Sequence, residues 1–373
     1  MKNFSLFCAL FTAWTCWQPA MSAEVQFRDA VRIERGHLLH TTQLVSSGQK
    51  SVGSAVKDFI QQLDKLAQKH GTHLEDMVKL NLNCREDWRS KLPMISEELL
   101  NHQEIAKARP AITLLPNAIP GKGDLAGDAV FNSPQKSPNS GTGCFIPPNH
   151  EILYVSGKVG KADNLVSATR KTIESLKSTL DSLGATPVNI VQIKAFINPM
   201  ESWQAVQKAI AESLGKDVTL PPLVLVEWQW DNTEIELIAS LPTCQTQRPD
   251  GLSIHTPEGE SASPNYSRVS IVRSSELIYL SAIDSRPTGN PDEQTRALLR
   301  AQGAALKKVG GNLHNLAKAT YYVSSNEASR GLNNVRREFY DTSRPPAASK
   351  VMVTYTGGKG ETHLMDLIAV PVE

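Results

Sequence analysis

This sequence has no excess of charge of either sign. Its 39 Lys and Arg residues nearly balance 38 Asp and Glu residues, which leaves a formal net charge of +1 over 373 residues. Basic residues do not form runs with aromatic residues between them, so nothing favours nucleic-acid binding. The 9 histidines are scattered and offer no cluster of metal ligands. We therefore expect no nucleic-acid partner, no metal and no cofactor.

Long apolar runs are also rare, and the one that stands out is at the N-terminus. Lys2 precedes an apolar stretch over residues 4–17, and small residues follow it. A basic start, a hydrophobic segment and a small-residue exit are typical of a secretory signal. The alternative, a membrane anchor, needs about 20 apolar residues, and Thr12 and Gln18 interrupt this run. We expect a signal peptide over residues 1–23, a secreted or periplasmic protein, and no membrane partner.

One pattern of roughly 110 residues recurs three times along the chain. In each copy a glycine follows a long helical pattern, and a proline comes later at a matching spacing. These anchors are Gly71, Gly184 and Gly310, then Pro110, Pro222 and Pro346. Two anchors that recur in the same order make coincidence a poor explanation, so the sequence predicts three tandem repeats.

Each repeat predicts an α+β unit. Before each glycine, apolar residues such as Val56, Ile60 and Leu63 recur at spacings of one helix face. After it, residues such as Val78 and Leu80 alternate with polar ones, which is typical of a strand. Each unit is thus expected to have a mixed sheet with two helices on one face. Its bare face is most simply buried against the other two units around a pseudo-threefold axis.

The segments between the copies are rich in Pro, Ser, Gly and Asn, which is typical of linkers. The predicted divisions are a signal peptide at 1–23, repeat 1 at 24–131, a linker at 132–145, repeat 2 at 146–243, a linker at 244–263, and repeat 3 at 264–373. We expect a monomer whose three repeats form an intramolecular pseudo-trimer.

Cysteine is scarce, and two of the 5 cysteines, Cys8 and Cys16, lie in the predicted signal peptide. Cys144 and Cys244 bracket the middle repeat, and in an oxidising compartment they could form a disulfide. The alternative is three separate thiols, because geometry rather than spacing decides pairing. Cys84 would then be left without a disulfide partner and buried in its strand.

Three short motifs resemble the YjgF/RidA family, also called the L-PSP endoribonuclease-like family. They are the strand end Ser156-Gly157, the run Arg109-Pro110-Ala111, and residues 234–239. The resemblance implies three chorismate-mutase-like, RidA-like units in one chain, where the family usually assembles homotrimers. It also implies small-molecule sites in the clefts between units, where some members deaminate enamines and imines.

In those deaminases an arginine two residues after the anchor proline clamps the substrate carboxylate, for which a planar guanidinium is well suited. That position corresponds here to Ile112, Val224 and Ala348, so all three copies lack the arginine. Lys350 follows two residues later and points to the same side of an extended strand. It could restore one positive charge; the alternative is a solvated surface lysine.

The resemblance also implies the other site residues. In the family, an acid lies on the last strand of each unit, which we call the closing strand, and it would hold the attacking water or act as general base. It corresponds to Asp366 and Glu236, with Asp128 in the first copy. The residues implied to bind substrate are Tyr266, Ser281 and Asn333 in the third copy, and Ser156 and Gly157 in the second.

Two functions follow as hypotheses. In the first, an exported protein binds a small imine, enamine or carbonyl metabolite in its interdomain clefts, chiefly the one with Lys350 and Asp366, and hydrolytically deaminates it. In the second, the clefts bind a small molecule or serve as a scaffold without turnover. Endoribonuclease activity, which only the family's name suggests, is the least favoured because no basic groove or stacking platform is present.

Overall fold

The computed structural model describes residues 26–48, 51–230, 233–243, 251–283 and 289–372. The expected signal peptide at 1–23 and the expected disulfide partner Cys244 lie outside these ranges. Within them, no helix is both long enough and apolar enough to span a bilayer. The expectations of export and of a Cys144–Cys244 bridge therefore stay predictions. Cys84 is buried in its strand, as predicted.

Each repeat contributes its own helices and strands. Repeat 1 contains β1 (Ala30–Glu34), β2 (His37–Thr41), β3 (Leu44–Val45), α1 (Val52–Lys69), β4 (Met77–Cys84), α2 (Leu92–Leu100), α3 (Gln103–Ala108), β5 (Ala111–Pro116) and β6 (Leu125–Ser133). Repeat 2 contains β7 (Gly143–Ile146), β8 (His150–Gly160), α4 (Leu165–Asp181), β9 (Ile190–Ile197), α5 (Trp203–Leu214), β10 (Leu223–Glu227) and β11 (Thr233–Pro242). Repeat 3 contains β12 (Leu252–His255), β13 (Val269–Val272), β14 (Glu276–Leu280), α6 (Pro291–Lys308), β15 (Leu316–Val323), α7 (Asn326–Val335), β16 (Ala347–Met352) and β17 (His363–Ala369).

The strands form three mixed sheets, and each sheet borrows strands from another repeat. The orders are β5-β4-β6-β2-β7, β10-β9-β11-β8-β13-β12, and β1-β14-β17-β15-β16. Strand β7 of repeat 2 thus extends the sheet of repeat 1, β12 and β13 of repeat 3 extend that of repeat 2, and β1 of repeat 1 extends that of repeat 3. This exchange joins the three units in a closed circle.

The exchanged strands correct the predicted linkers. Strand β7 begins within the segment 132–145, and β12 lies inside the segment 244–263, both of which we had predicted to be linkers. The polar and Pro-rich composition masked them because each is an edge strand of only four residues. Such strands are formed by pairing with a neighbouring sheet rather than by their own pattern.

The long helices and their glycines are as predicted. A side-chain cap starts each helix: Ser51 for α1, Asn164 for α4 and Asn290 for α6. The apolar stripe of α1 at Val56, Ile60 and Leu63 is buried. The glycines after the helices have φ of 72° at Gly71, 70° at Gly184 and 78° at Gly310. These left-handed values explain the repeated glycine, because other residues are strained there.

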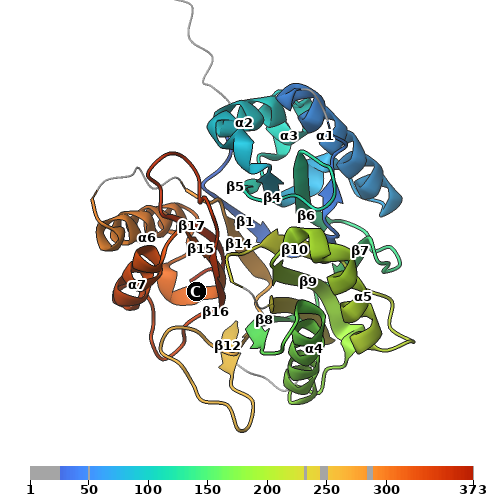
Figure 1. Ribbon diagram of the computed structural model, residues 1–373, viewed down its shortest axis with the longest axis vertical. Coiled ribbons are helices and arrows are strands. Elements are labelled where there is room, and N and C mark those ends of the chain that lie inside the picture. The colour runs from blue at the N-terminus through green and yellow to red at the C-terminus, as the bar shows by residue number, and fades with distance from the viewer. Residues whose placement is uncertain (1–25, 49–50, 231–232, 244–250, 284–288, 373) are drawn as a thin grey trace, which may run out of the picture.

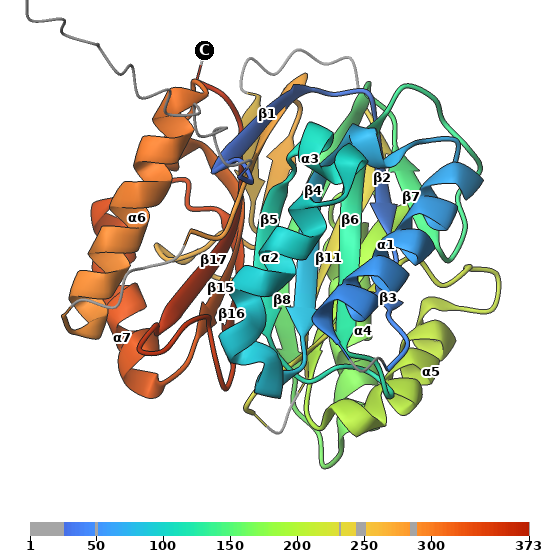
Figure 2. The same cartoon turned by 90° about the horizontal axis from the view of Figure 1, so that it is seen from above.

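The predicted bare sheet faces meet in the centre of the molecule. The helices cover the outer faces, and the three sheets pack on each other inside them (Figures 1 and 2). One apolar cluster draws on all three repeats, with Val78, Val191 and Ala317 as corresponding members. A second shared cluster includes Leu115, Phe196, Tyr322 and their neighbours. The predicted α+β fold of three units is confirmed.

Candidate functional site

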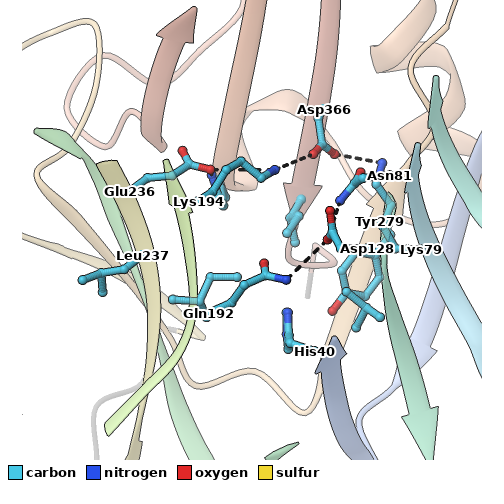
Figure 3. Close-up of a pocket in the computed structure, with 14 residues that line it drawn as sticks. His40, Lys79, Asn81, Asp128, Gln192, Lys194, Glu236, Leu237, Tyr279 and Asp366 are labelled. Atoms are coloured by element: carbon cyan, nitrogen blue, oxygen red, sulfur yellow. Dashed lines mark hydrogen bonds and ion pairs between the residues drawn. The ribbon is translucent and has the colours of Figure 1, made fainter. Parts of the chain in front are cut away.

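The three closing-strand acids lie in a buried chamber at the centre of the molecule. Asp128 on β6, Glu236 on β11 and Asp366 on β17 are at most 9% exposed. Three buried lysines of the strands β4, β9 and β15 lie between them. These are Lys79, Lys194 and Lys318. Figure 3 shows Lys79, Lys194 and the three acids pointing toward one another from different sheets. The chamber thus holds equal numbers of cations and acids.

The ion pairs in the chamber connect different repeats. Lys79 Nζ lies 2.8 Å from Asp366 Oδ1, and Lys318 Nζ lies 2.7 Å from Glu236 Oε1. Lys194 Nζ lies 3.9 Å from a carboxylate oxygen of each of these two acids. Although burial alone would raise it, the lysines hold the pKa of Asp366 below its usual value. The cluster therefore ties the repeats together.

Asp128 differs from the other two acids because it pairs with amides. Asn81 Nδ2 and Gln192 Nε2 donate to its Oδ2 at 3.2 and 3.4 Å (Figure 3). Burial raises the pKa of Asp128, although Lys194 acts against the shift. Lys194 stands two residues after Gln192, which occupies the sheet position of Lys79 and Lys318. The lysine of repeat 2 therefore lies two residues further along its strand than the lysines of the other two repeats.

The chamber is too small for a metabolite. A cavity of about 30 Å³ remains between the side chains, which is room for roughly one or two water molecules. The two shared apolar clusters, with Val78 in one and Phe196 in the other, pack beside these charged side chains within the same shared core. The arrangement suits a structural ion-pair network better than a substrate site.

The expected cleft that holds both Lys350 and Asp366 does not form. On β15, Thr320 is paired with Asp366 and Tyr321 with Lys350. Adjacent residues of a strand point to opposite faces, so Asp366 faces the central chamber and Lys350 faces the helix side of the sheet. Asp366 and Glu236 are therefore separated from the clefts in which we had expected them to act.

Sheet register also corrects one position of the missing arginine. Ala111 and Ala347 pair with Lys79 and Lys318, whereas Leu223 pairs with Ile193, the residue after Gln192. Because Gln192 occupies the position of the two lysines, Leu223 corresponds to Ile112 and Ala348. The expected position in repeat 2 was Val224. The proline anchor of repeat 2 is Pro221, and the double proline hid this shift of one residue.

Two expected substrate-binding serines join neighbouring repeats instead of lining open space. Ser156 Oγ accepts from the backbone N–H of Ala348 at 2.7 Å and donates to Ser267 O at 2.5 Å. Ser281 Oγ accepts from Ile112 N at 2.8 Å and donates to Arg28 O at 2.6 Å. Their hydroxyls hold the cleft walls together.

The cleft between repeats 2 and 3 combines an acid with a cation, and we call it cleft 2/3. Glu234, two residues before Glu236 on β11, lies here beside Gly157 and Ser349. A Cβ atom at position 157 would overlap the Glu234 carboxylate, so the glycine makes room for the acid. Burial raises the pKa of Glu234 to about 8, against the opposing effects of Ser349, Lys318 and Lys350. A carboxyl group with this pKa can exchange a proton near neutral pH.

The other wall of cleft 2/3 comes from repeat 3. Lys350 is half-buried on the edge strand β16, and its charge and that of Glu234 affect each other's pKa. Tyr266 is partly buried, and its hydroxyl accepts from Arg268 Nη1 at 2.7 Å. Asn333 lies on α7, and its Oδ1 is buried without a hydrogen-bond partner. Lys350 is therefore not the fully solvated lysine that we had considered.

The cleft between repeats 1 and 2 has different contents. Gln43 takes the place of Gly157, and its side chain pairs with the backbone of β10: Nε2 donates to Leu225 O at 2.9 Å, and Leu225 N donates to Oε1 at 3.2 Å. Ala126 occupies the position of Glu234. A cavity of about 450 Å³ beside Gln43 is lined by Trp203 and Lys122 among others. This cleft therefore has no acid at the position of Glu234.

The cleft between repeats 3 and 1 has neither charge. Leu364 stands at the position of Glu234, and Leu114 at that of Lys350. Ala282 replaces Gly157, and its backbone N–H donates to Ile112 O at 2.8 Å. Within the described residues, cleft 2/3 is thus the one that has both an acid at the position of Glu234 and a lysine at that of Lys350.

Glu234 escaped the sequence-based assignment, although the repeats contain a signal that could have found it. The position of Glu236 is acidic in every copy, as Asp128, Glu236 and Asp366, whereas that of Glu234 is acidic in one. A residue type that recurs in all three copies serves the shared core. An acid present in a single copy at a cleft is the better candidate for chemistry.

Comparison with known families gives one match. The model of the family "Endoribonuclease L-PSP" matches residues 148–240 and 259–362, just over half of the chain. A comparison with curated protein sequences gave no match.

Several solved structures are similar to parts of the chain. A YjgF-family protein of Neisseria meningitidis is 21% identical, covers 26% of this chain and 81% of its own, and has a TM-score of 0.25. A member of the YjgF family from Mycobacterium tuberculosis is 24% identical, with coverages of 24% and 79% and a TM-score of 0.22. The yeast protein YEO7 is 20% identical, with coverages of 32% and 99% and a TM-score of 0.25.

Proposed function

Because the chain belongs to the endoribonuclease L-PSP family, also known as the YjgF/RidA family, we propose that cleft 2/3 binds a small imine, enamine or carbonyl metabolite and hydrolytically deaminates the imine. The observation that supports this most is the buried Glu234 carboxyl beside Gly157, with Lys350 within electrostatic reach. The proposal moves the catalytic acid from Asp366 and Glu236 to Glu234.

The proposed reaction needs a base and a water molecule. Ionised Glu234 takes a proton from water as the water oxygen attacks the carbon of the C=N bond. This proton passes to the nitrogen and gives a carbinolamine. The hydroxyl proton of the carbinolamine then moves to the nitrogen, the C–N bond breaks, and ammonia leaves as the carbonyl forms. Water is consumed and no electron is transferred, so the reaction requires no metal or cofactor. Lys350 attracts the negative end of the ligand and orients it toward the base.

The broader setting is part of the same proposal. The basic and apolar N-terminal sequence supports export to a secreted or periplasmic location. The closed circle of exchanged strands supports a monomer that acts as a pseudo-trimer, and the balanced charge gives no support to a nucleic-acid or membrane partner. The missing arginine in all three copies makes the site unlike that of the deaminases it resembles.

A non-catalytic binding protein is the second candidate. The cleft between repeats 1 and 2 favours it, because a cavity of about 450 Å³ remains there without an acid at the position of Glu234. A ligand in that cleft would be held by apolar and amide contacts around Trp203 and Gln43, with no group placed to activate water.

An assay of ammonia release tests the proposal. 2-Iminobutanoate would be generated enzymatically in the presence of the chain without residues 1–23, and ammonia release would be followed over time. We expect release faster than in buffer alone, and an unchanged rate for Glu212→Gln, an exposed acid on α5.

Thermal shift with 2-oxobutanoate separates the two candidates, because a bound ligand raises the unfolding temperature whether or not it reacts. A shift without ammonia release would favour the binding protein. If the protein shows no thermal shift and releases no ammonia, both candidates are contradicted.

A further inference from the structure

Three polar side chains, one from each repeat, lie next to the acids of the central chamber. Each stands opposite the residue two positions after a closing-strand acid, on the strand that pairs with the closing strand. Two positions along a strand return to the same face, and paired residues share that face. All three therefore face the centre of the molecule. They are His40 on β2, Tyr154 on β8 and Tyr279 on β14, and we call them the central ring.

The central ring is buried, and its polar atoms have no partner in the protein. None of its side chains is more than 1% exposed. In the described part of the chain, both ring nitrogens of His40 and the hydroxyls of Tyr154 and Tyr279 lack a hydrogen-bond partner. Burying such groups unpaired is costly, and native folds rarely do so. Because the same position is affected in all three repeats, a shared ligand explains the pattern better than one misplaced side chain.

The cavity beside the central ring fits a ligand of one heavy atom. Its volume is about 30 Å³, and His40 and Tyr279 line it together with the lysines and acids of the chamber (Figure 3). This is enough room for a water molecule or a monatomic ion. A phosphate group or a metabolite is too large.

The central ring offers hydrogen-bond donors. Burial keeps both tyrosines protonated, because it raises the pKa of each phenol. Burial, with the charge of Lys194, lowers the pKa of His40 to about 4, so the imidazole is neutral and one of its nitrogens carries a proton. Glu236 Oε2 is also buried without a hydrogen-bond partner, but it lies in the neighbouring layer, where the lysines balance the acids.

Arg35 adds a positive charge that no acid of the chamber balances. It is 5% exposed, and its Nη1 and Nη2 donate to Ser274 O at 2.9 Å and His150 O at 2.8 Å, while its Nε has no partner. Within the described ranges, Arg35 pairs with backbone carbonyls rather than with an acid. Its charge acts on the phenols of Tyr154 and Tyr279, so it is close enough to attract an anion held by them.

We propose that the central ring binds one chloride ion, which accepts hydrogen bonds from Tyr154, Tyr279 and His40 and offsets the charge of Arg35. A water molecule could accept the same hydrogen bonds but would leave that charge unbalanced. Because the three donors belong to three repeats, the bound ion stabilises the association of the repeats. This site shares no residue with cleft 2/3, so it does not depend on the proposed deaminase activity.

Anomalous diffraction from crystals of the protein grown in sodium bromide tests the location of the ion, because bromide replaces chloride and can be identified. We expect one bromide peak inside each chain, within hydrogen-bond distance of the hydroxyls of Tyr154 and Tyr279. Electron density for a water molecule at this place, without an anomalous peak, would overturn the inference. So would bromide peaks that lie only on the surface.

Thermal unfolding tests the site in solution. The unfolding temperature of wild type should rise as chloride replaces methanesulfonate at constant ionic strength, because a ligand of the folded state stabilises it by mass action. The double variant Tyr154→Phe with Tyr279→Phe should lose this dependence. Tyr355→Phe is the matched control, because Tyr355 is partly exposed and stacks with Arg89, and it should respond like wild type.

Two results in solution would contradict the chloride site. One is a wild-type unfolding temperature that does not change with chloride. The other is a double variant that is more stable than wild type at every chloride concentration, which would show that the hydroxyls are buried without any ligand. If the double variant does not fold, as judged by circular dichroism, the bromide position in wild-type crystals decides.

Discussion

Glu234→Gln is expected to lower the rate of imine hydrolysis by roughly 10²- to 10⁴-fold, the usual contribution of a positioned general base. In wild type, kcat/KM should rise with pH to a plateau above an apparent pKa of about 8, the pKa to which burial raises Glu234. In the variant this rise should be absent. The pH profile of ammonia release measures both effects.

The same substitution is expected to stabilise the fold at high pH. The folded protein keeps a proton on Glu234 up to about pH 8, whereas the unfolded chain releases it near the ordinary value of about 4.3. The stability linked to this proton is therefore complete at low pH and is lost as pH rises through the folded pKa, by about 1.4 kcal/mol per pH unit. Glu234→Gln should escape that loss.

Urea unfolding of both proteins between pH 5 and 9 gives the difference directly. A variant that is less active yet more stable than wild type at pH 9 would fit a strained functional carboxyl. A variant that is less stable at every pH would show that Glu234 serves the fold, and the proposed base would be wrong.

Lys318→Met is expected to destabilise the protein by about 3 to 5 kcal/mol, the usual cost of leaving one partner of a buried ion pair unpaired. Its ammonium lies 2.7 Å from Glu236, which is 1% exposed. The lost interaction joins repeats 2 and 3, so we expect a lower urea midpoint for the whole chain rather than for one repeat.

Two controls isolate the charge. Lys177→Met breaks an exposed pair with Glu174 on α4, and it should cost less than about 1 kcal/mol. The double variant Lys318→Met with Glu236→Leu removes both buried charges and should recover much of the lost stability. If Lys318→Met costs no more than Lys177→Met, the charged side chains of the chamber do not form a stabilising ion-pair network.

Most of the fold could be predicted from the sequence because the same physical requirements recur in each repeat. Gly71, Gly184 and Gly310 each end a helix with positive φ, and the apolar stripes before them are buried as their spacing predicts. The pairing of β1, β7 and β13 with strands of another repeat is not visible in this way. These short strands pair with residues more than a hundred positions away, and local pattern says nothing about which sheet edge is free.

The site was harder to predict because two glutamates that are close together on one strand have different roles. Glu234 and Glu236 are two residues apart on β11, so strand period places both on one side. The packing of repeat 3 against that strand brings Lys318 to Glu236 and Ser349 to Glu234. Lys350 was found by its spacing from Ala348, whereas its half-buried position depends on tertiary packing.

The number of ligand sites per chain tests most directly whether function is confined to one of the three clefts. Calorimetric titration of the full protein with 2-oxobutanoate should give one site per chain, and Lys350→Met should abolish it. Three equivalent sites per chain, or one site that is unaffected by Lys350→Met, would contradict the assignment to cleft 2/3.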